Sequence, residues 1–516
     1  MTSLWKLTPA PPLESSPFEA GRRRDVIVVG AGITGLTTAL MLARDGRDVA
    51  LVDAGDVAEL ATGSNTGKLS LLQGAVLSTL RRHHPASLVR AYVEANRAGA
   101  QWLTEFARDA GVPFSRRIAY SYAQGPDGAA TVAEEAAAAL EAGLPVRRLS
   151  PVPDAWGFPA VDAVALDDQV AIDPQAVAIA LARAFVDAGG ALHLHTRVRR
   201  VGVVPSPVIE TDAGSATADD IVLATGTPIV DRGLYFAKTR GLRSYCVAFD
   251  VDAEVPDGLF LSVDGPTRSI RSVTDQDGPS GSARLIVGGN GHPVGRGDSE
   301  QRHVAEIVAW TRARYPEAET VACWSAQDYE SHDLIPFVGV MPRTLGRVRF
   351  ATGFGKWGLS NGPAAALRLA SEIRREPFKD RPEWMRTIAR RITVPADLGR
   401  GGVENLRVGW EAASRWVDSQ RTAVPVSRPD EGEGIVAHRG GHPVGVSTVE
   451  GLTRAVSAVC PHLGGVLSWN DAECTWDCPL HASRFRPDGT RIEGPASRDL
   501  AELPRTPHED ESAERV

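Results

Sequence analysis

The sequence has few cysteines, no long apolar run and no excess of basic residues. Its 516 residues contain five cysteines, too few and too scattered for the disulfide framework of a small secreted domain. No stretch reaches the roughly 20 apolar residues that a membrane-spanning helix needs. Lys and Arg number 56 against 64 Asp and Glu, which gives a net charge of −8. These absences argue against a disulfide scaffold, a membrane span and a nucleic-acid partner.

Size and composition are those of ordinary globular material. Hydrophobic residues make up 43% of the chain and charged residues 23%, and the length predicts about three domains. Three arginines at 22–24 precede an apolar run, but the run at 26–32 is too short and too broken by glycine for the core of an export signal. We therefore expect a cytoplasmic protein.

Two Cys-plus-His pairs near the C-terminus carry the strongest chemical signal. Residues 460–462 read Cys-Pro-His, and after fifteen residues 478–481 read Cys-Pro-Leu-His. A Rieske centre needs such pairs, because two thiolates hold one iron of a [2Fe-2S] cluster and two imidazoles hold the other. A zinc site accepts the same ligand types at similar short spacings, so spacing alone leaves both open.

The residues around the pairs favour the cluster. Segments 460–464 (Cys-Pro-His-Leu-Gly) and 476–485 (Trp-Asp-Cys-Pro-Leu-His-Ala-Ser-Arg-Phe) resemble the two cluster-binding loops of Rieske proteins. The resemblance implies a Rieske-type [2Fe-2S] cluster with four ligands: Cys460, His462, Cys478 and His481.

Two departures from the Rieske pattern have chemical consequences. Gly465 and Leu480 stand where respiratory Rieske proteins have the cysteines of a loop-to-loop disulfide. Ser483 matches the serine that hydrogen-bonds the cluster in high-potential members, whereas Phe485 replaces their tyrosine. Fewer hydrogen bonds to sulfur lower the potential, so we expect a centre in the lower part of the Rieske range of about −150 to +300 mV.

A nucleotide-binding signature lies near the N-terminus. An apolar strand from residue 25 opens into the Gly-x-Gly-x-x-Gly pattern of residues 30–35, and a helical pattern follows over 36–45. A second strand at 48–52 ends in Asp53. Glycines that admit a pyrophosphate, a helix N-terminus and an acidic residue about 20 positions on are the parts of a Rossmann dinucleotide site. The alternative is a strand-to-helix turn that binds nothing.

Later segments favour FAD over NAD. Asp173 and Pro174 predict the start of a helix that runs to about residue 188. The segment 218–226 is a strand ending in Ala-Thr-Gly, which resembles the second nucleotide-contacting strand of FAD proteins. The segment 348–358 resembles the closing strand and flavin-facing loop of the D-amino-acid, glycine and sarcosine oxidases. The FAD contacts so implied are Gly30, Gly32, Gly35, Asp53, Thr66, Ala224, Thr225, Gly226, Gly353, Phe354 and Gly358.

Nearly the whole chain resembles one family, the FAD-dependent oxidoreductases of the D-amino-acid oxidase and glycine oxidase type with a fused C-terminal Rieske domain. The resemblance implies an α/β FAD-binding domain, Rossmann-like and of the glutathione-reductase type, an α+β substrate domain, and an all-β Rieske domain. The expected divisions are an N-terminal extension (1–24), the oxidoreductase (25–375), a linker (376–428), the Rieske domain (429–510) and a tail (511–516). Within the oxidoreductase, FAD-binding pieces at about 25–85, 165–230 and 330–375 alternate with substrate-domain pieces at about 86–165 and 231–329. Residues 86–165 read as Ala-rich amphipathic helices, and 240–325 as strands.

The resemblance implies oxidation of a C–N bond in an amine or amino acid. A fused one-electron centre offers an exit for the electrons, so we expect a dehydrogenase that serves an external carrier, a ferredoxin, a cytochrome or a quinone-linked protein, rather than oxygen alone. Two alternatives stay open. In one, electrons enter through the Rieske domain and support a flavin-based monooxygenase; in the other, the chain is a non-catalytic electron-transfer flavoprotein.

Substrate-handling residues are the least determined part of the sequence. The segment 357–362 has no basic residue where amino-acid oxidases bind the substrate carboxylate. Lys68 follows the loop where the family approaches the flavin, and its charge fits stabilisation of reduced flavin or activation of oxygen, against a solvated loop lysine. His292 is a candidate base against a surface-turn histidine, and Trp357 a candidate ring contact against a core aromatic.

Overall fold

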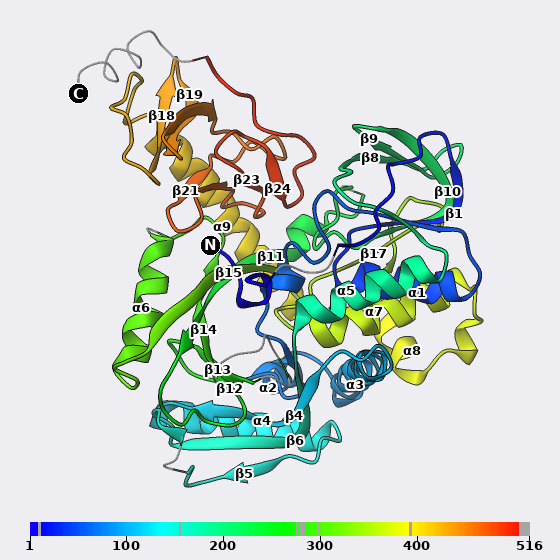
Figure 1. Ribbon diagram of the computed structural model, residues 1–516, viewed down its shortest axis with the longest axis vertical. Coiled ribbons are helices and arrows are strands. Elements are labelled where there is room, and N and C mark those ends of the chain that lie inside the picture. The colour runs from blue at the N-terminus through cyan, green and yellow to red at the C-terminus, as the bar shows by residue number, and fades with distance from the viewer. Residues whose placement is uncertain are drawn as a thin grey trace.

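A computed structural model describes residues 1–8, 12–153, 156–230, 232–274, 277, 284–297, 299–391 and 395–504, with side chains from residue 399 onward in the last range. The structure has three parts grouped around a common centre (Figure 1). The nucleotide-binding part lies at the right of this view, the substrate part at the lower left, and the C-terminal domain, in orange and red, at the upper left.

The nucleotide-binding part is a sheet with different layers on its two faces. In the described residues the sheet has eight strands, and its main path runs β16-β17-β10-β1-β2-β7, with the β8–β9 hairpin attached to β10. Strands β17, β10, β1, β2 and β7 are parallel, and β16 is antiparallel. The strands are β1 (Arg23–Val29), β2 (Val49–Val52), β7 (Ala191–His193), β8 (Val198–Gly202), β9 (Val208–Thr211), β10 (Gly214–Leu223), β16 (Phe337–Val340) and β17 (Val348–Thr352). The helices are α1 (Ile33–Arg44), α5 (Pro174–Asp187) and α7 (Gly358–Ile373).

Alternating side chains of β1 separate those layers. Val26 and Val28 pack with the helices, whereas Ile27 and Val29 pack with the β8–β9 side. This is the two-residue period of a strand buried on both faces. Asp173 caps α5 by accepting from the N–H groups of Gln175 and Ala176, as expected from the Asp-Pro start.

The substrate part is built on a larger sheet of nine strands in the described residues, with the path β15-β11-β14-β13-β12-β4-β6-β3 and β5 beside β6. Its strands are β3 (Lys68–Leu69), β4 (Phe114–Ala123), β5 (Arg147–Leu149), β6 (Asp162–Ile172), β11 (Thr239–Asp250), β12 (Leu259–Ser262), β13 (Arg268–Val273), β14 (Arg284–Pro293) and β15 (Glu319–Ser331). Helices α2 (Val76–His83), α3 (Ala86–Asp109), α4 (Ala129–Glu141) and α6 (Glu300–Arg312) cover it or join it to the nucleotide part.

The expectation that residues 86–165 are helical is wrong in part. Helices α3 and α4 lie there, but so do β4, β5 and the start of β6. β4 pairs with β6 and with β12, far along the chain, so its backbone hydrogen bonds are long-range. Such pairing decides β structure more than local propensity does.

The C-terminal domain consists of two small antiparallel sheets. One holds β18 (Gly434–Arg439), β19 (His442–Val449) and β20 (Leu452–Ser457). The other holds β21 (Ser468–Asn470), β22 (Thr475–Asp477), β23 (Arg484–Phe485) and β24 (Arg491–Glu493). Helices α8 (Glu383–Ala389) and α9 (Pro395–Ser419) precede it. α9 touches both halves of the chain, because Asn405 donates to the Ala237 carbonyl and Trp416 to the Gly464 carbonyl. No helix among the described residues is long and apolar enough to cross a membrane.

Candidate functional site

A cavity of about 810 Å³ opens at the carboxyl ends of the parallel strands. It runs from the turn after β1, past Asp53, to the wall of the substrate sheet, and it is closed on one side by the C-terminal domain. Of the predicted FAD contacts, those that line it are Gly30, Gly32, Asp53, Thr66, Ala224, Thr225, Gly226, Gly353, Phe354 and Gly358. Lys68 and Trp357 line it as well. These residues come from five separate stretches of sequence, so the fold gathers them at one site.

The turn after β1 requires glycine for two different reasons. Gly30 has φ +112°, and a Cβ there would lie 2.4 Å from the Ala224 carbonyl oxygen. A Cβ on Gly35 would lie 1.9 Å from the Gly30 carbonyl oxygen. Gly35 does not line the cavity; it lets the helix pack directly on the turn, which is the usual part of the third glycine in this motif. At Gly30 the turn therefore presents backbone, not a side chain, to the cavity.

Asp53 lies at the end of β2 with its carboxylate turned toward the turn. Its Oδ2 accepts from the N–H of Ala31 at 2.6 Å and its Oδ1 from the N–H of Gly55 at 2.8 Å. Burial raises the pKa of Asp53, and the two backbone N–H groups oppose that effect. Each oxygen keeps a second lone pair, so the carboxylate can still accept from a hydroxyl in the cavity.

Lys68 is a buried cavity lysine, not a solvated one. Its side chain is 8% exposed, and its Nζ donates to the Phe260 carbonyl at 2.6 Å and to Ser269 Oγ at 2.8 Å. Burial, reinforced by the charge of Arg271, lowers the pKa of Lys68 to about 7. An amine with a pKa near neutrality can hold or release a proton at physiological pH.

His292 lies away from the cavity. Its Nε2 is 3.0 Å from the hydroxyl oxygen of Tyr245, its Nδ1 is 2.9 Å from the Pro293 carbonyl, and its ring stacks on His303 at 4.6 Å. Burial lowers the pKa of His292 to about 4. Of the three predicted catalytic residues, Lys68 and Trp357 line the cavity, whereas His292 does not.

The two Cys-plus-His loops meet in the C-terminal domain. Cys460 and Cys478 are both buried, and their thiols lie within hydrogen-bonding reach of each other. The rings of His462 and His481 are 5.1 Å apart between centroids. The Nδ1 atom of His481 is buried without a hydrogen-bond partner among the described residues.

Two thiols side by side and two imidazoles side by side are the donor set of a Rieske cluster, in which each iron takes two protein ligands. A buried ring nitrogen without a hydrogen bond is costly unless a further group binds it. Within the described ranges, no group of three or more His, Cys, Asp or Glu side chains is arranged to hold a single metal ion. Ser483 Oγ contributes a hydrogen bond to Cys460, and Phe485 packs beside the two cysteines, so the serine and phenylalanine lie where the sequence suggested.

The oxidoreductase part covers the two histidines. The Phe236 ring meets the His462 ring at 4.8 Å and the His481 ring at 4.7 Å, both edge to face. Phe236 belongs to a short 3-10 helix, Tyr235–Lys238, that directly precedes β11. The two Cys-plus-His loops of the C-terminal domain therefore pack against the oxidoreductase part.

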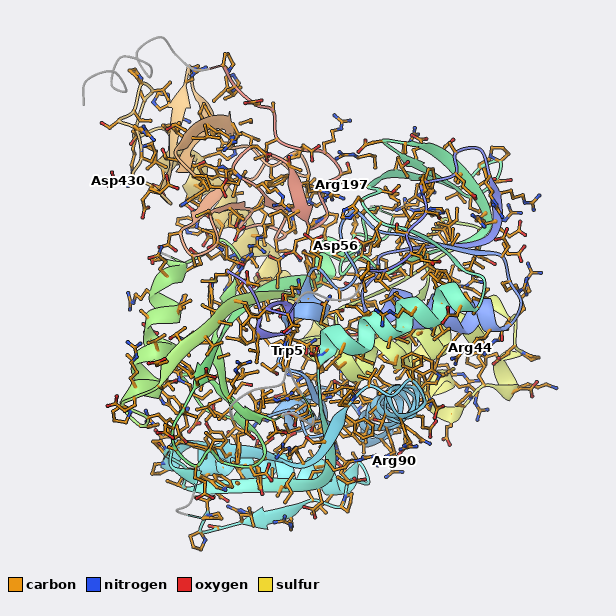
Figure 2. The ribbon with its side chains drawn as sticks, in the orientation of Figure 1. Trp5, Arg44, Asp56, Arg90, Arg197 and Asp430 are labelled. Atoms are coloured by element: carbon orange, nitrogen blue, oxygen red, sulfur yellow. The ribbon has the colours of Figure 1, made fainter. Side chains whose placement is uncertain are left out.

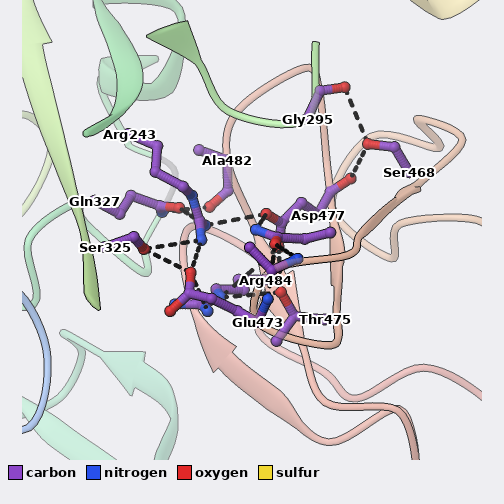
Figure 3. Close-up of polar contacts among 12 residues, drawn as sticks. Arg243, Gly295, Ser325, Gln327, Ser468, Glu473, Thr475, Asp477, Ala482 and Arg484 are labelled. Atoms are coloured by element: carbon purple, nitrogen blue, oxygen red, sulfur yellow. Dashed lines mark hydrogen bonds and ion pairs between the residues drawn. The ribbon is translucent and has the colours of Figure 1, made fainter. Parts of the chain in front are cut away.

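A buried ionic cluster fixes this docking (Figure 3). Arg243 of β11, fully buried, forms ion pairs with Glu473 and with Asp477, the latter at 3.0 Å. Arg484 reaches Glu473 from the other side at 2.7 Å. Burial alone would raise the pKa of Glu473, but the charges of Arg484 and Arg243 outweigh it and lower the pKa to about 2. Asp477 immediately precedes Cys478, a predicted cluster ligand, so these ion pairs hold the second Cys-plus-His loop in place.

The two outermost strands of the substrate sheet are shared between both sites. On β11 and β15, Arg243, Ser325 and Gln327 contact the C-terminal domain, whereas Ser244 and Asp328 line the cavity. Gln327 donates to the Ala482 carbonyl at 2.8 Å, and Ala482 follows the predicted ligand His481. Gln327 lines the cavity as well, so the cavity and the C-terminal domain meet along these strands. No local sequence pattern points to Arg243, Ser325 or Gln327, because their partners in the C-terminal domain lie more than a hundred positions away.

The C-terminal domain also closes the cavity itself. Arg486, Arg491, Glu493 and Gly494 line it from that domain. At the same boundary, Arg197 and Asp56 line the cavity, and Figure 2 shows Arg197 beside the C-terminal domain and Asp56 below it. The nucleotide cavity and the cysteine–histidine loops are thus adjoining parts of one site.

Fold and donor sets together define the class: a flavin-dependent oxidoreductase that carries an iron–sulfur centre. The chain belongs to the family described as FAD dependent oxidoreductase, which matches residues 25–372, and a Rieske [2Fe-2S] domain matches residues 422–504. The protein binds FAD and a [2Fe-2S] cluster.

Three relatives support this assignment. A Bacillus subtilis (strain 168) protein named as the Rieske 2Fe-2S iron-sulfur protein YhfW is 27% identical over 495 residues and covers 93% of each chain. The glycine oxidase of Bacillus licheniformis is 27% identical over 378 residues, 70% of this chain and 96% of its own. The crystal structure of glycine oxidase from Geobacillus kaustophilus has a TM-score of 0.61 at 19% identity and covers 72% of this chain and all of its own, which shows the shared fold.

Proposed function

We propose that this enzyme oxidises a C–N bond of an amine or amino acid and passes the electrons singly through its Rieske centre to an external acceptor. The observation that carries the proposal is that residues of β15 contact both the cavity and the C-terminal domain. Gln327 and Tyr329 line the cavity, and both donate to the carbonyl of Ala482, at 2.8 and 3.3 Å. One hydrogen bond and one peptide unit therefore separate the cavity wall from the ligand His481.

The cavity residues fit the binding of FAD. The backbone of the turn around Gly30 and Gly32 can approach a pyrophosphate, the N-terminus of α1 faces it, and the Asp53 carboxylate can accept from the ribose. Farther along the cavity, residues 353–358 and Lys68 would flank the ring. FAD supplies the two-electron acceptor for a hydride from the substrate carbon.

The protein's own part in the oxidation is to orient the substrate and manage charge and protons. Lys68, with its pKa lowered to about 7 by burial, can change protonation state without leaving its contacts to Phe260 and Ser269. Trp357, at the start of α7, offers an apolar surface on the cavity wall. Closure of the cavity by the C-terminal domain would exclude water from the reacting groups.

The four Cys and His side chains would hold the [2Fe-2S] cluster, and the docking geometry supports an exit of electrons through it. The relatives named as glycine oxidases favour an amino-acid-like substrate. The Rieske domain, which glycine oxidase matches do not extend into, favours an acceptor other than oxygen alone: a ferredoxin, a cytochrome or a quinone-linked carrier.

The test is an anaerobic titration of the holoprotein with a panel of amines and amino acids, followed by absorbance and electron paramagnetic resonance. A substrate should bleach the flavin absorbance, and the signal of the reduced Rieske centre should then appear. Reduction by no member of the panel, together with reduction through a carrier protein or an NAD(P)H-linked reductase, would contradict the proposal and favour entry of electrons for oxygenation.

A further inference from the structure

Two arginines from different domains face the same end of the cavity. Arg197 directly precedes β8 in the nucleotide-binding part, and Arg491 is the first residue of β24 in the Rieske domain. Both side chains line the cavity, and Figure 2 shows Arg197 beside the Rieske domain. No sequence pattern connects the two residues, because they lie far apart in the chain.

Arg197 lies beside the residue expected to bind the adenosine ribose. The N–H of its neighbour Thr196 donates to the Asp53 carbonyl at 2.7 Å. The Asp53 carboxylate accepts from two backbone N–H groups, and the nearby Glu59 pairs with Arg486 at 3.8 Å. Neither acid forms an ion pair with Arg197 in the part of the chain that the structure describes.

Arg491 is 5% exposed and is held at two points, which leave part of its guanidinium unused. Its backbone N–H donates to Asp499 Oδ1 at 2.8 Å, and its Nη1 donates to the Ala496 carbonyl. Its Nε is fully buried, whereas Nη2 keeps accessible surface and has no hydrogen-bond partner among the described residues. A ligand in the cavity can therefore accept from Nη2.

The positive charges of these two arginines are not neutralised locally. A third arginine, Arg199, forms ion pairs with Asp212 and Asp499, both at 3.0 Å. Arg197 and Arg491 form none within the described ranges. Burial lowers the pKa of Arg491 to about 10, and the like charges of Arg197 and Arg199 add to the effect. An anion that accepts from both guanidiniums would remove this repulsion.

We propose that Arg197 and Arg491 bind the pyrophosphate of FAD, so that the Rieske domain supplies part of the flavin site. Guanidinium groups suit phosphate oxygens because their N–H groups form a fixed fork and carry a permanent charge. The position next to Asp53 supports the ADP half of FAD, the half that carries the negative charge. The inference goes beyond the proposed function, because it concerns retention of FAD and not the substrate or the acceptor.

The test measures retention of FAD by the full-length holoprotein. FAD that dissociates on dilution is separated by ultrafiltration and measured by its absorbance, and ADP or adenosine is added as a competitor. ADP carries the pyrophosphate, whereas adenosine has the same base and ribose without it. We expect Arg197→Gln and Arg491→Gln each to weaken FAD and ADP about tenfold or more, and to leave adenosine unchanged.

Arg498→Gln is the matched control for Arg491→Gln. It removes the same charge from the same domain at an exposed position that does not line the cavity. FAD, ADP and adenosine should bind to it as to the wild type. The Rieske signal in electron paramagnetic resonance reports whether Arg491→Gln leaves its domain folded. If that signal is lost, Arg491→Met removes the same charge without a buried amide, and the same three affinities decide the matter.

Wild-type affinity for FAD in both glutamine variants would overturn the inference. Equal weakening of ADP and adenosine would also overturn it, since that result indicates a general change in the cavity. An effect of Arg197→Gln alone, with wild-type affinities at position 491, would remove the Rieske domain from the flavin site. None of these measurements depends on turnover.

Discussion

The nucleotide cavity and the iron–sulfur loops of this enzyme differ in how their parts reach the site. The cavity draws residues from segments scattered over 460 positions, held by a sheet whose strands are far apart in sequence. The four Cys and His side chains come from two loops within 22 residues of chain. Cluster ligation is therefore local, whereas flavin binding depends on the whole fold. We expect each site to form without the other, whereas their connection depends on a third set of residues, those on β11 and β15.

The largest expected effect is loss of the iron–sulfur cluster without loss of FAD. His481→Ala removes one of the two imidazoles, so the Rieske signal in electron paramagnetic resonance should disappear while FAD stays bound. Flavin bleaching by substrate should persist, and turnover with the natural acceptor should fall to the background. The control is His442→Ala, an exposed residue at the start of β19. Unchanged turnover in His481→Ala would remove the relay.

A smaller effect should follow when the connection alone is broken. Arg243→Gln removes one of the two arginines that pair with Glu473 and Asp477. Breaking a buried ion pair costs about 3–5 kcal/mol. We expect a lower thermal unfolding midpoint and slower reduction of the cluster after the flavin is reduced, with substrate bleaching of flavin preserved.

Arg200→Gln is the surface control for this change. Arg200 pairs with Glu210 at 3.4 Å with 74% of its side chain exposed, and such pairs contribute about 0–1 kcal/mol. Cluster reduction at the wild-type rate in Arg243→Gln would show that the ionic cluster does not position the domains.

Burial of Lys68 makes the stability of the folded protein depend on pH. Its pKa falls from 10.5 to about 7 on burial, so between these values the unfolded chain holds a proton that the folded chain lacks. Stability should rise with pH across this window, and the full cost of the buried ammonium is present below about 7, at roughly 1.4 kcal/mol for each pKa unit.

Lys68→Met should remove this slope. Relative to the wild type, the variant gains most at about pH 6.5 and least near pH 10, as measured by unfolding at several pH values. Lys379→Met, an exposed lysine outside the cavity, serves as the control and should follow the wild-type profile. A parallel profile for Lys68→Met would mean that Lys68 keeps its proton throughout.

The smallest effect concerns the cluster alone. Phe485 packs beside Cys460 and Cys478 in place of the hydroxyl-bearing residue of high-potential Rieske proteins. Phe485→Tyr should raise the reduction potential, because a hydrogen bond to sulfur favours the reduced cluster. A redox titration followed by electron paramagnetic resonance measures the shift, with Phe378→Tyr on the surface as the control. A lower or unchanged potential would show that the hydroxyl does not reach the cluster.

The sequence predicted those features whose physical cause is local. The Gly-x-Gly-x-x-Gly turn, the Asp173 cap and the two Cys-plus-His pairs each depend on residues within a few positions of one another. The strand β4 was missed because its pairing partners lie far along the chain. Arg243 and Arg491 were missed for the same reason, since burial of a charge is a property of the assembled fold. His292 is the opposite case: its local sequence suggested a site residue, but in the assembled sheet its side chain stacks on His303, away from the cavity.

The central claim is that flavin and cluster are electronically connected within one chain, and this can be tested without knowing the substrate. The holoprotein is illuminated anaerobically with a sacrificial donor, so that light absorbed by bound FAD reduces it, and samples are frozen at intervals for electron paramagnetic resonance. The account predicts that the Rieske signal grows as flavin absorbance falls, and that it grows more slowly in Arg243→Gln. Complete bleaching of the flavin with a cluster that stays oxidised, although dithionite reduces it, would contradict it.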